Sequence, residues 1–195
     1  MTGQQLIELI GSFDEVCYSG GAAGADRLFG LYANSVGIPA IHFSFDRHKL
    51  YVPESESISV PQNLLTSPDI IAKLKKANQS LGRSIPKPGT YVYNLLARNS
   101  YQVVCTERVY AIGTMVSPTQ VDGGTAWAVQ MYMDANEVRE IYVYDRVRGT
   151  LFTFDNNIGE FVETETVPAP HGKWTGIGSR SATELDMQIM ETKFI

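Results

Sequence analysis

The pattern of apolar and polar positions predicts helices and strands in alternation. Apolar residues recur at helical spacing over residues 3–12 and 26–36, whereas the short apolar runs at 15–18 and 39–45 predict buried strands. A glycine-rich loop lies between the first strand and the second helix, and Gly37 marks that helix's end. Strand, loop, helix and strand form a βαβ unit, whose crossover makes the two strands parallel.

The same pattern continues to the end of the chain. Helices are predicted at about 69–80, at 90–100 and after the GGT at 123–125, with strands at 108–115 and 140–145 and an edge hairpin at 151–155 and 160–164. The last segment, from Lys173 to Ile195, predicts a strand, a Gly-Ser-Arg turn and an amphipathic helix, an arrangement with which α/β domains usually begin. We therefore expect one domain over residues 1–195, with a Rossmann-like parallel sheet flanked by helices and a small β-hairpin at the sheet edge.

The segment at about 46–89 is less regular, because prolines interrupt it repeatedly. Long irregular insertions in compact domains are more often lids or binding loops than filler, so we expect a lid-like insertion here. Five basic residues cluster in its second half: Lys73, Lys75, Lys76, Arg83 and Lys87. They form either a solvated helix face and loop or a phosphate-facing flap over a site.

Composition narrows the function. The 195-residue chain has 44% hydrophobic residues and a net charge of -5, with no apolar run of the roughly 20 residues that a membrane span needs. We expect a soluble, cytoplasmic protein with no membrane partner, and the acidic balance makes nucleic acid an unlikely partner. Cys17 and Cys105 lie in apolar runs that predict strands, and the three histidines are scattered. No metal site or cofactor is therefore expected.

Three glycine-rich junctions carry the candidate chemistry, at residues 19–26, 122–125 and 176–180. In a doubly wound sheet such junctions lie at the carboxyl edge of the strands, where ligands bind, and N–H groups at helix N-termini suit phosphate. The spacing matches neither GxGxxG nor GxxxxGKS. The candidate ligand-binding residues of these junctions are Ser19, Gly20, Gly21, Ala22, Gly24, Asp26, Asp122, Gly123, Gly124, Thr125, Trp127, Gly178, Ser179 and Arg180. We expect a phosphate against the bare backbone from Gly20 to Gly24.

Several of these residues have a second interpretation. Asp26 is placed to cap its helix, and Asp122 either binds a ribose hydroxyl or acts as a base. Trp127 and Trp174 flank glycine loops, where a tryptophan either stacks on a nucleobase or packs in the core.

The segment SGGAAGADRLFG, with GGT before a later helix, resembles the SLOG superfamily of Rossmann-like nucleotide-binding domains. That superfamily includes cytokinin-activating phosphoribohydrolases, the DNA-processing protein DprA and sensors of cyclic ADP-ribose signals. TGIGSR, SGGAAGAD, ARNSYQVV and VDGGTAWAVQ resemble segments of small phage-encoded SLOG proteins, over about half the chain. The resemblance implies a phosphorylated nucleotide or ADP-ribose-type ligand, and it places Arg98 where relatives carry an arginine that could clamp a phosphate.

Two departures from that family are informative. In the relatives the GIGSR strand comes first, whereas here it ends the chain, so we infer a circular permutation like that of the permuted YpsA branch. This predicts adjacent termini, with the helix at 182–194 leading into residues 1–10. The phosphoribohydrolases also carry a glutamate after GGT, whereas here Ala126 follows Thr125.

The missing glutamate favours capture over turnover: a phage anti-defence protein that sequesters a host immune signal such as cyclic ADP-ribose. One alternative is a nucleotide N-glycosidase or phosphoribohydrolase in which Asp122 or Glu107 replaces the glutamate. Another is a DprA-like single-strand nucleic-acid binder. We also expect a homo-oligomer, because two helices are expected to expose apolar faces: Leu6, Ile7 and Ile10, and Met187, Ile189, Met190 and Phe194.

Overall fold

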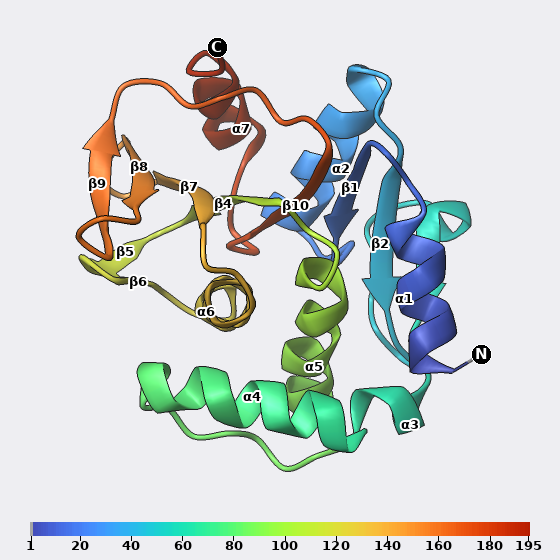
Figure 1. Ribbon diagram of the computed structural model, residues 1–195. Coiled ribbons are helices and arrows are strands. Elements are labelled where there is room, and N and C mark those ends of the chain that lie inside the picture. The colour runs from blue at the N-terminus through green and yellow to red at the C-terminus, as the bar shows by residue number, and fades with distance from the viewer. Residues whose placement is uncertain (1) are drawn as a thin grey trace.

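The structure is a computed structural model that describes residues 2–195. Its centre is an eight-stranded sheet (Figure 1), in the spatial order β3 (Ser57–Ser59), β2 (Ala40–Ser44), β1 (Val16–Ser19), β10 (Lys173–Gly178), β4 (Arg108–Gly113), β7 (Glu140–Asp145), β8 (Thr150–Asp155) and β9 (Glu160–Thr164). In this spatial order, the six strands β3, β2, β1, β10, β4 and β7 are parallel to one another, and β8 and β9 form an antiparallel hairpin at one edge. The expected α/β fold, mostly parallel sheet and edge hairpin are confirmed.

Helices cover both faces of the sheet. One face carries α2 (Ala25–Ser35) and α7 (Glu184–Glu191), which pack into one apolar cluster. The other face carries α1 (Gly3–Gly11), α3 (Gln62–Leu65), α4 (Pro68–Leu81), α5 (Tyr91–Val103) and α6 (Thr125–Ala135) over a larger cluster. A fully buried strand is apolar toward both layers, which explains the continuous apolar runs of β1 and β4.

The last strand of the chain lies in the middle of the sheet. Strand β10 pairs with β1 on one side and with β4 on the other, both in parallel. The two ends of the chain, however, are far apart, because α1 and α7 lie on opposite faces of the sheet (Figure 1). The expectation of adjacent termini is therefore wrong.

The segment at about 46–89 is more regular than its prolines predict. It contains a 3-10 turn (Glu54–Glu56), the edge strand β3 and the helices α3 and α4, and α4 packs against α5 and α6. Only the connection from Gly82 to Gly89 runs without helix or strand between α4 and α5. Residues 45–53, between β2 and the 3-10 turn, are irregular as well, and we call the connection from Gly82 to Gly89 the strap. The lid-like role expected for the segment stays a prediction.

Two further expectations are corrected by packing. Of the apolar residues from which a homo-oligomer was expected, Leu6, Ile10, Met187 and Met190 are buried within the chain, whereas Ile7, Ile189 and Phe194 are half-buried. The exposed apolar faces are thus smaller than expected, and the homo-oligomer stays a prediction. Cys17 is buried in β1, but Cys105 is half-buried just beyond the end of α5 and belongs to no strand. Within residues 2–195, no helix combines the length and hydrophobicity of a membrane span.

Candidate functional site

The carboxyl ends of three neighbouring strands meet at one pocket. Strand β1 leads outward to β2, and β4 leads to β7 on the other side of β10, so the order of the strands reverses here. Such a switch point is the usual ligand site of a doubly wound sheet. The pocket has a volume of about 510 Å³. Most of the predicted site residues line it: Ala22, Asp26, Arg98, Asp122, Gly123, Gly124, Thr125, Trp127, Gly178, Ser179 and Arg180.

The first glycine loop does not present bare backbone to this pocket. A Cβ added at Gly20 would lie 1.1 Å from Nη1 of Arg98, so the guanidinium group occupies the space that this glycine leaves. Gly21 is covered by Leu50 and Val52. The contact of a phosphate with this backbone, expected from the sequence, is therefore not supported, because the protein's own side chains fill the space.

Gly24 and Ser19 of that loop are also enclosed. Gly24 has a φ of 77° and lies against the backbone of Ser179 and Arg180, where an added Cβ would be 2.3 Å from the carbonyl oxygen of Ser179. The Ser19 hydroxyl is buried and donates to the carbonyl of Asp26 at 2.8 Å. These residues hold the loop closed, and only Ala22 and Asp26 of the segment at 19–26 reach the pocket.

Asp26 is a buried carboxylate in the pocket wall, only 4% exposed. Its Oδ2 accepts from Nη2 of Arg98 at 3.2 Å, and the backbone of Ala22 and Gly178 lies near the carboxylate and favours its charged form. Burial raises the pKa of Asp26, and the positive charge of Arg98 opposes that shift. The helix cap is Gly24, so the expected capping role of Asp26 is wrong.

Arg98 lies opposite Asp26 on α5 and is also 4% exposed. Its Nη1 donates to Oε1 of Gln102 at 2.7 Å, and its Nε has no hydrogen-bond partner among the residues described. Burial lowers the pKa of Arg98 and the Asp26 carboxylate opposes this, and a guanidinium keeps its proton in any case. A buried donor without a hydrogen-bond partner destabilises the folded protein, so the Nε atom is a candidate donor to a ligand.

The GGT loop reaches the pocket by an indirect route. The chain leaves β4, forms a small antiparallel hairpin of β5 (Met115–Ser117) and β6 (Gln120–Val121), and returns when the Asp122 N–H donates to the carbonyl of Thr114 at 2.8 Å. Asp122 is exposed at the rim, whereas Thr125 and Trp127 are buried in the wall. The expected direct passage from sheet strand to helix is thus replaced by a hairpin.

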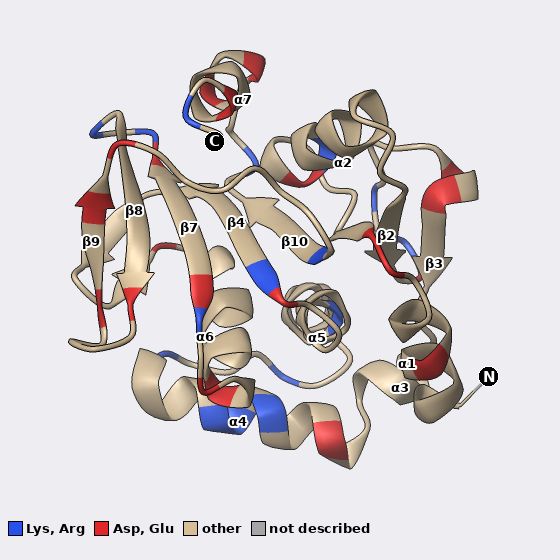
Figure 2. Cartoon of the chain, turned by 45° about the horizontal axis from the view of Figure 1, so that its top comes forward, with Lys and Arg blue, Asp and Glu red and all other residues tan. Residues whose placement is uncertain are grey.

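Two arginines lie nearer the mouth. Arg180 follows β10, is exposed and forms no ion pair within residues 2–195. Arg83 comes from the strap, and its Nη1 donates to the carbonyl of Gly123 at 2.7 Å. The lysines of the basic cluster do not join them, because none of them lines the pocket. Lys73 pairs with Asp69 at 2.8 Å and Lys76 donates to the carbonyl of Asp134 at 2.8 Å. Figure 2 shows the basic positions on α4. The flap interpretation therefore applies to Arg83 alone.

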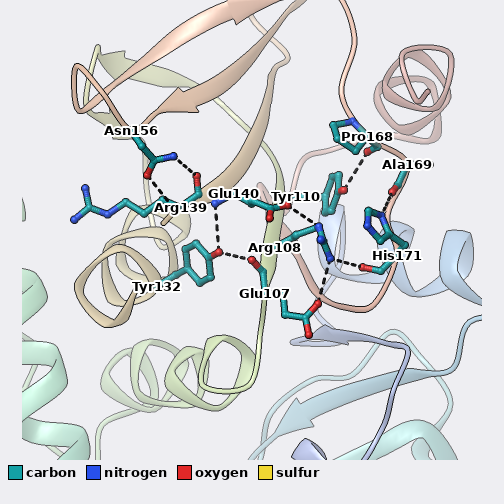
Figure 3. Close-up of polar contacts among 10 residues, drawn as sticks. All are labelled: Glu107, Arg108, Tyr110, Tyr132, Arg139, Glu140, Asn156, Pro168, Ala169 and His171. Carbon is teal, nitrogen blue, oxygen red and sulfur yellow. Dashed lines mark hydrogen bonds and ion pairs between the residues drawn. The ribbon is translucent and has the colours of Figure 1, made fainter. Parts of the chain in front are cut away.

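Glu107, the other carboxylate considered for catalysis, lies at the opposite edge of the sheet. Figure 3 shows it near the start of β4, where Nη1 of Arg108 pairs with it at 3.2 Å and Nε of Arg108 pairs with Glu140 at 2.6 Å. The hydroxyl of Tyr132 donates to the carbonyl of Glu107 in the same network. Glu107 therefore lies at the amino ends of the parallel strands and does not line the pocket.

Of the two tryptophans, one lines the pocket and the other does not. Trp174 is fully buried among Phe29, Tyr32 and Tyr110 on the α2 face, so it is a core residue and does not line the pocket. Trp127 belongs to the core of the other face, is 4% exposed and contributes to the pocket wall.

The pocket also has walls that the motifs did not reveal. Helix α5 contributes Val92, Leu95, Leu96 and Asn99 besides Arg98, and these positions share one helical face. That spacing is visible in the sequence and could have indicated the wall. Ser84 and Pro86 of the strap, together with Gly113, Thr114 and Ile177, complete the lining. Within residues 2–195, no three His, Cys, Asp or Glu side chains are placed to hold a metal ion.

These features define an α/β protein with a mixed polar and apolar pocket at the switch point of a mostly parallel sheet. Comparisons of the chain with protein-family models, curated proteins and solved structures found no match.

Proposed function

We propose that this protein binds a phosphorylated nucleotide, or an ADP-ribose-type or cyclic nucleotide, in this pocket. The observation that carries the proposal is the convergence of the three glycine-rich segments and Arg98 on one cavity. Its volume of about 510 Å³ falls in the range of small-molecule sites, roughly 300–1,000 Å³. Such sites combine apolar walls with a few polar groups that fix the orientation of the ligand.

The walls provide both kinds of group. Leu96, Trp127 and Ile177 offer apolar surface suited to a flat base, while Asn99 and the unpartnered Nε of Arg98 offer polar contacts from buried positions. Burial strengthens each hydrogen bond because water is excluded from the site. A nucleotide has this combination of an apolar ring and hydrogen-bonding edges.

The proposal includes a SLOG-type fold with circular permutation, based on the sequence resemblance. The central position of β10 supports it, because a chain that began at β10 would add β1, β2 and β3 outward on one side and β4 and β7 on the other. Since α1 and α7 lie on opposite faces of the sheet, a relative with the other strand order needs a different connection between these helices. A phage origin and sequestration of a host signal belong to the same proposal.

Capture without turnover is the preferred form of the proposal. The buried carboxylate Asp26 is committed to an ion pair with Arg98 at 3.2 Å, which is typical of a structural group. Hydrolysis of an N-glycosidic bond is the second candidate, because Asp122 is exposed in the lining with one carboxylate oxygen uncommitted. If that candidate holds, Asp122→Asn abolishes turnover but keeps binding.

The test is to incubate the purified protein with mono-, di- and cyclic nucleotides and ADP-ribose variants, isolate the complex, release the ligand by heat and identify it by mass spectrometry. We expect one intact ligand in stoichiometric amount, retained in Lys75→Ala, which removes an exposed positive charge away from the pocket. The ligand should be lost in the double variant Asp26→Leu with Arg98→Met, which removes the Nε donor without leaving a buried charge uncompensated. A recovered base with a sugar phosphate would establish hydrolysis instead. If nothing is retained from the whole panel, the proposed function is wrong.

A further inference from the structure

We propose that the ligand's phosphates lie at the mouth of the pocket, between Arg83 and Arg180, and that its base points inward. This orientation makes a nucleoside with two linked phosphates the preferred ligand class. The inference rests on the proposed function and reverses the orientation expected from the glycine loop, where the phosphate would have been innermost.

The inner part of the pocket has no net charge to offer a phosphate. Its buried polar pair is Asp26 with Arg98, in which one positive and one negative charge compensate each other at 3.2 Å. The rest of the buried wall is uncharged: Leu96, Trp127 and Ile177 are apolar, and Asn99 and Thr125 are neutral polar residues. A phosphate placed here would lose its water and approach the Asp26 carboxylate, which is unfavourable.

The first glycine loop cannot receive the phosphate either. The guanidinium of Arg98 fills the space above Gly20, and the backbone of Ser179 and Arg180 lies against Gly24. The first N–H of α2, that of Ala25, already donates to the carbonyl of Ser179 at 3.0 Å. The Arg27 N–H donates to the carbonyl of Ala22 at 3.1 Å, so both of these N–H groups, of the kind that usually hold a phosphate at a helix N-terminus, are engaged within the protein.

The mouth is positively charged. Arg180 is exposed without an ion pair within residues 2–195, and Arg83 donates to a neutral carbonyl, that of Gly123. Among the described lining residues the mouth has one carboxylate, Asp122, against these two arginines. Guanidinium groups form two parallel hydrogen bonds with phosphate oxygens, which are stronger than a bond to a neutral carbonyl.

The two arginines come from separate segments, the strap and the loop after β10. Each can therefore hold a different phosphate group, so a diphosphate gains two charge-assisted contacts where a monophosphate gains one. In the bound state Arg83 exchanges the Gly123 carbonyl for the ligand. This draws the strap, which also contributes Ser84 and Pro86 to the lining, onto the ligand.

The test is isothermal titration calorimetry with adenosine, AMP, ADP and ADP-ribose against the full chain. For the unmodified protein we expect affinity to rise about tenfold or more with each added phosphate. Arg83→Ala and Arg180→Ala should each remove one such step, and the double variant should bind all four compounds as weakly as adenosine. Lys75→Ala, the matched exposed control, should keep both steps.

The possible failures can be told apart. If the unmodified protein binds these nucleotides but the double variant keeps the full phosphate gain, the inference is wrong and the proposed function stands. If the unmodified protein binds none of the four, the proposed function fails for this ligand class and the inference fails with it. Because Arg83 and Arg180 are not buried, an unchanged melting temperature of both variants should show that the fold is intact.

Discussion

Asp26 connects three parts of the chain that are distant in sequence. Its carboxylate accepts a hydrogen bond from Arg98 on α5 and lies near the backbone of Ala22 in its own loop and of Gly178 at the end of β10. Both charged groups are almost completely buried. Removing one partner of such a pair leaves an uncompensated buried charge, whereas replacing both by apolar residues is often tolerated.

We therefore predict that Asp26→Ala lowers the free energy of unfolding by about 3–5 kcal/mol, measured by urea denaturation. The double replacement Asp26→Leu with Arg98→Met should be less destabilising than the sum of the single changes. As a control, Asp69→Ala removes the exposed pair with Lys73 and should change stability by less than about 1 kcal/mol. A loss below about 1 kcal/mol for Asp26→Ala would show that the buried charge of Arg98 is compensated elsewhere.

His42 gives the stability of the protein a predictable dependence on pH. It is fully buried on β2, and burial, with a smaller effect of the Arg98 charge, lowers its pKa to about 4. An unfolded histidine titrates near 6.5, so between about pH 6.5 and 4 the unfolded chain binds a proton that the folded protein does not. Stability should fall as the pH falls through this window, by about 3 kcal/mol from this residue.

The measurement is urea denaturation at several pH values for the unmodified protein and His42→Gln. The variant should lose less stability between pH 6.5 and 4 than the unmodified protein does. The exposed-site control His171→Gln should keep the original slope. Glu56, whose Oε2 lies 3.6 Å from Nε2 of His42, is the acidic group positioned to reduce the effect. An identical slope in all three proteins would disprove the assignment.

At the scale of secondary-structure elements, the contact between α2 and the sheet depends on a glycine. A Cβ added at Gly176 in β10 would lie 2.2 Å from Cβ of Phe29 in α2, so the helix can approach the strand only because this residue has no side chain. The same helix carries Asp26 into the pocket wall. The glycine therefore fixes the distance between the α2 layer and the pocket.

Gly176→Ala should destabilise the protein by about 1–3 kcal/mol, the usual range for overpacking a core. Thermal and urea unfolding would measure the change, with Gly124→Ala as the control because an added Cβ there meets nothing within 4 Å. Replacing Phe29 by leucine should not rescue Gly176→Ala, because leucine keeps the Cβ and Cγ atoms that would lie 2.2 and 2.4 Å from the added Cβ. Equal effects at the two glycines would refute this account.

Periodicity predicted most elements because their apolar faces are long enough to show a period. The strand predicted at 140–145 corresponds to β7, and the helix at 69–80 corresponds to α4 within two residues. The elements missed are β3, α3 and the hairpin of β5 and β6, which have two to four residues per strand or helix and so no measurable period. The irregularity of the segment at about 46–89, in contrast, was overestimated because prolines also occur at helix starts, as in α4.

The site was predicted in outline and missed in detail for one reason. A glycine indicates that another group approaches the backbone closely, but the sequence does not identify that group. At Gly20 it is Arg98, which lies far away in the sequence, and at Gly24 it is the loop after β10. These are long-range contacts, and only the three-dimensional arrangement distinguishes them from an approaching ligand.

At the scale of the whole molecule, the position of the last strand is the property that sets the topology. The segment from Thr166 to Ile195 is held by its own contacts: Val167 forms a bridge with Phe194, and the Ala169 N–H donates to the carbonyl of Ile195. Glu165 and Thr166 are both exposed. The chain can therefore be cut between them without removing a buried residue.

We predict that a rearranged chain folds when it begins at Thr166, continues through Ile195 and a flexible linker, and then runs from Thr2 to Glu165. Because α7 and α1 lie on opposite faces of the sheet, the linker must pass around an edge. A Gly/Ser linker of about 20 residues spans about 25 Å on average, whereas a direct junction leaves no chain to make the passage.

The linked form should unfold cooperatively within a few degrees of the natural order carrying the same linker at its C-terminus, as followed by circular dichroism. The directly joined form should melt at a much lower temperature or aggregate. In the rearranged chain, β10 is the first strand to be synthesised and not the last. Ligand retention by the linked form would therefore show that the pocket depends on the spatial arrangement of the strands and not on their order in the chain. Two equally stable proteins, linked and direct, would mean that the helices on the two faces can exchange position, contrary to this fold.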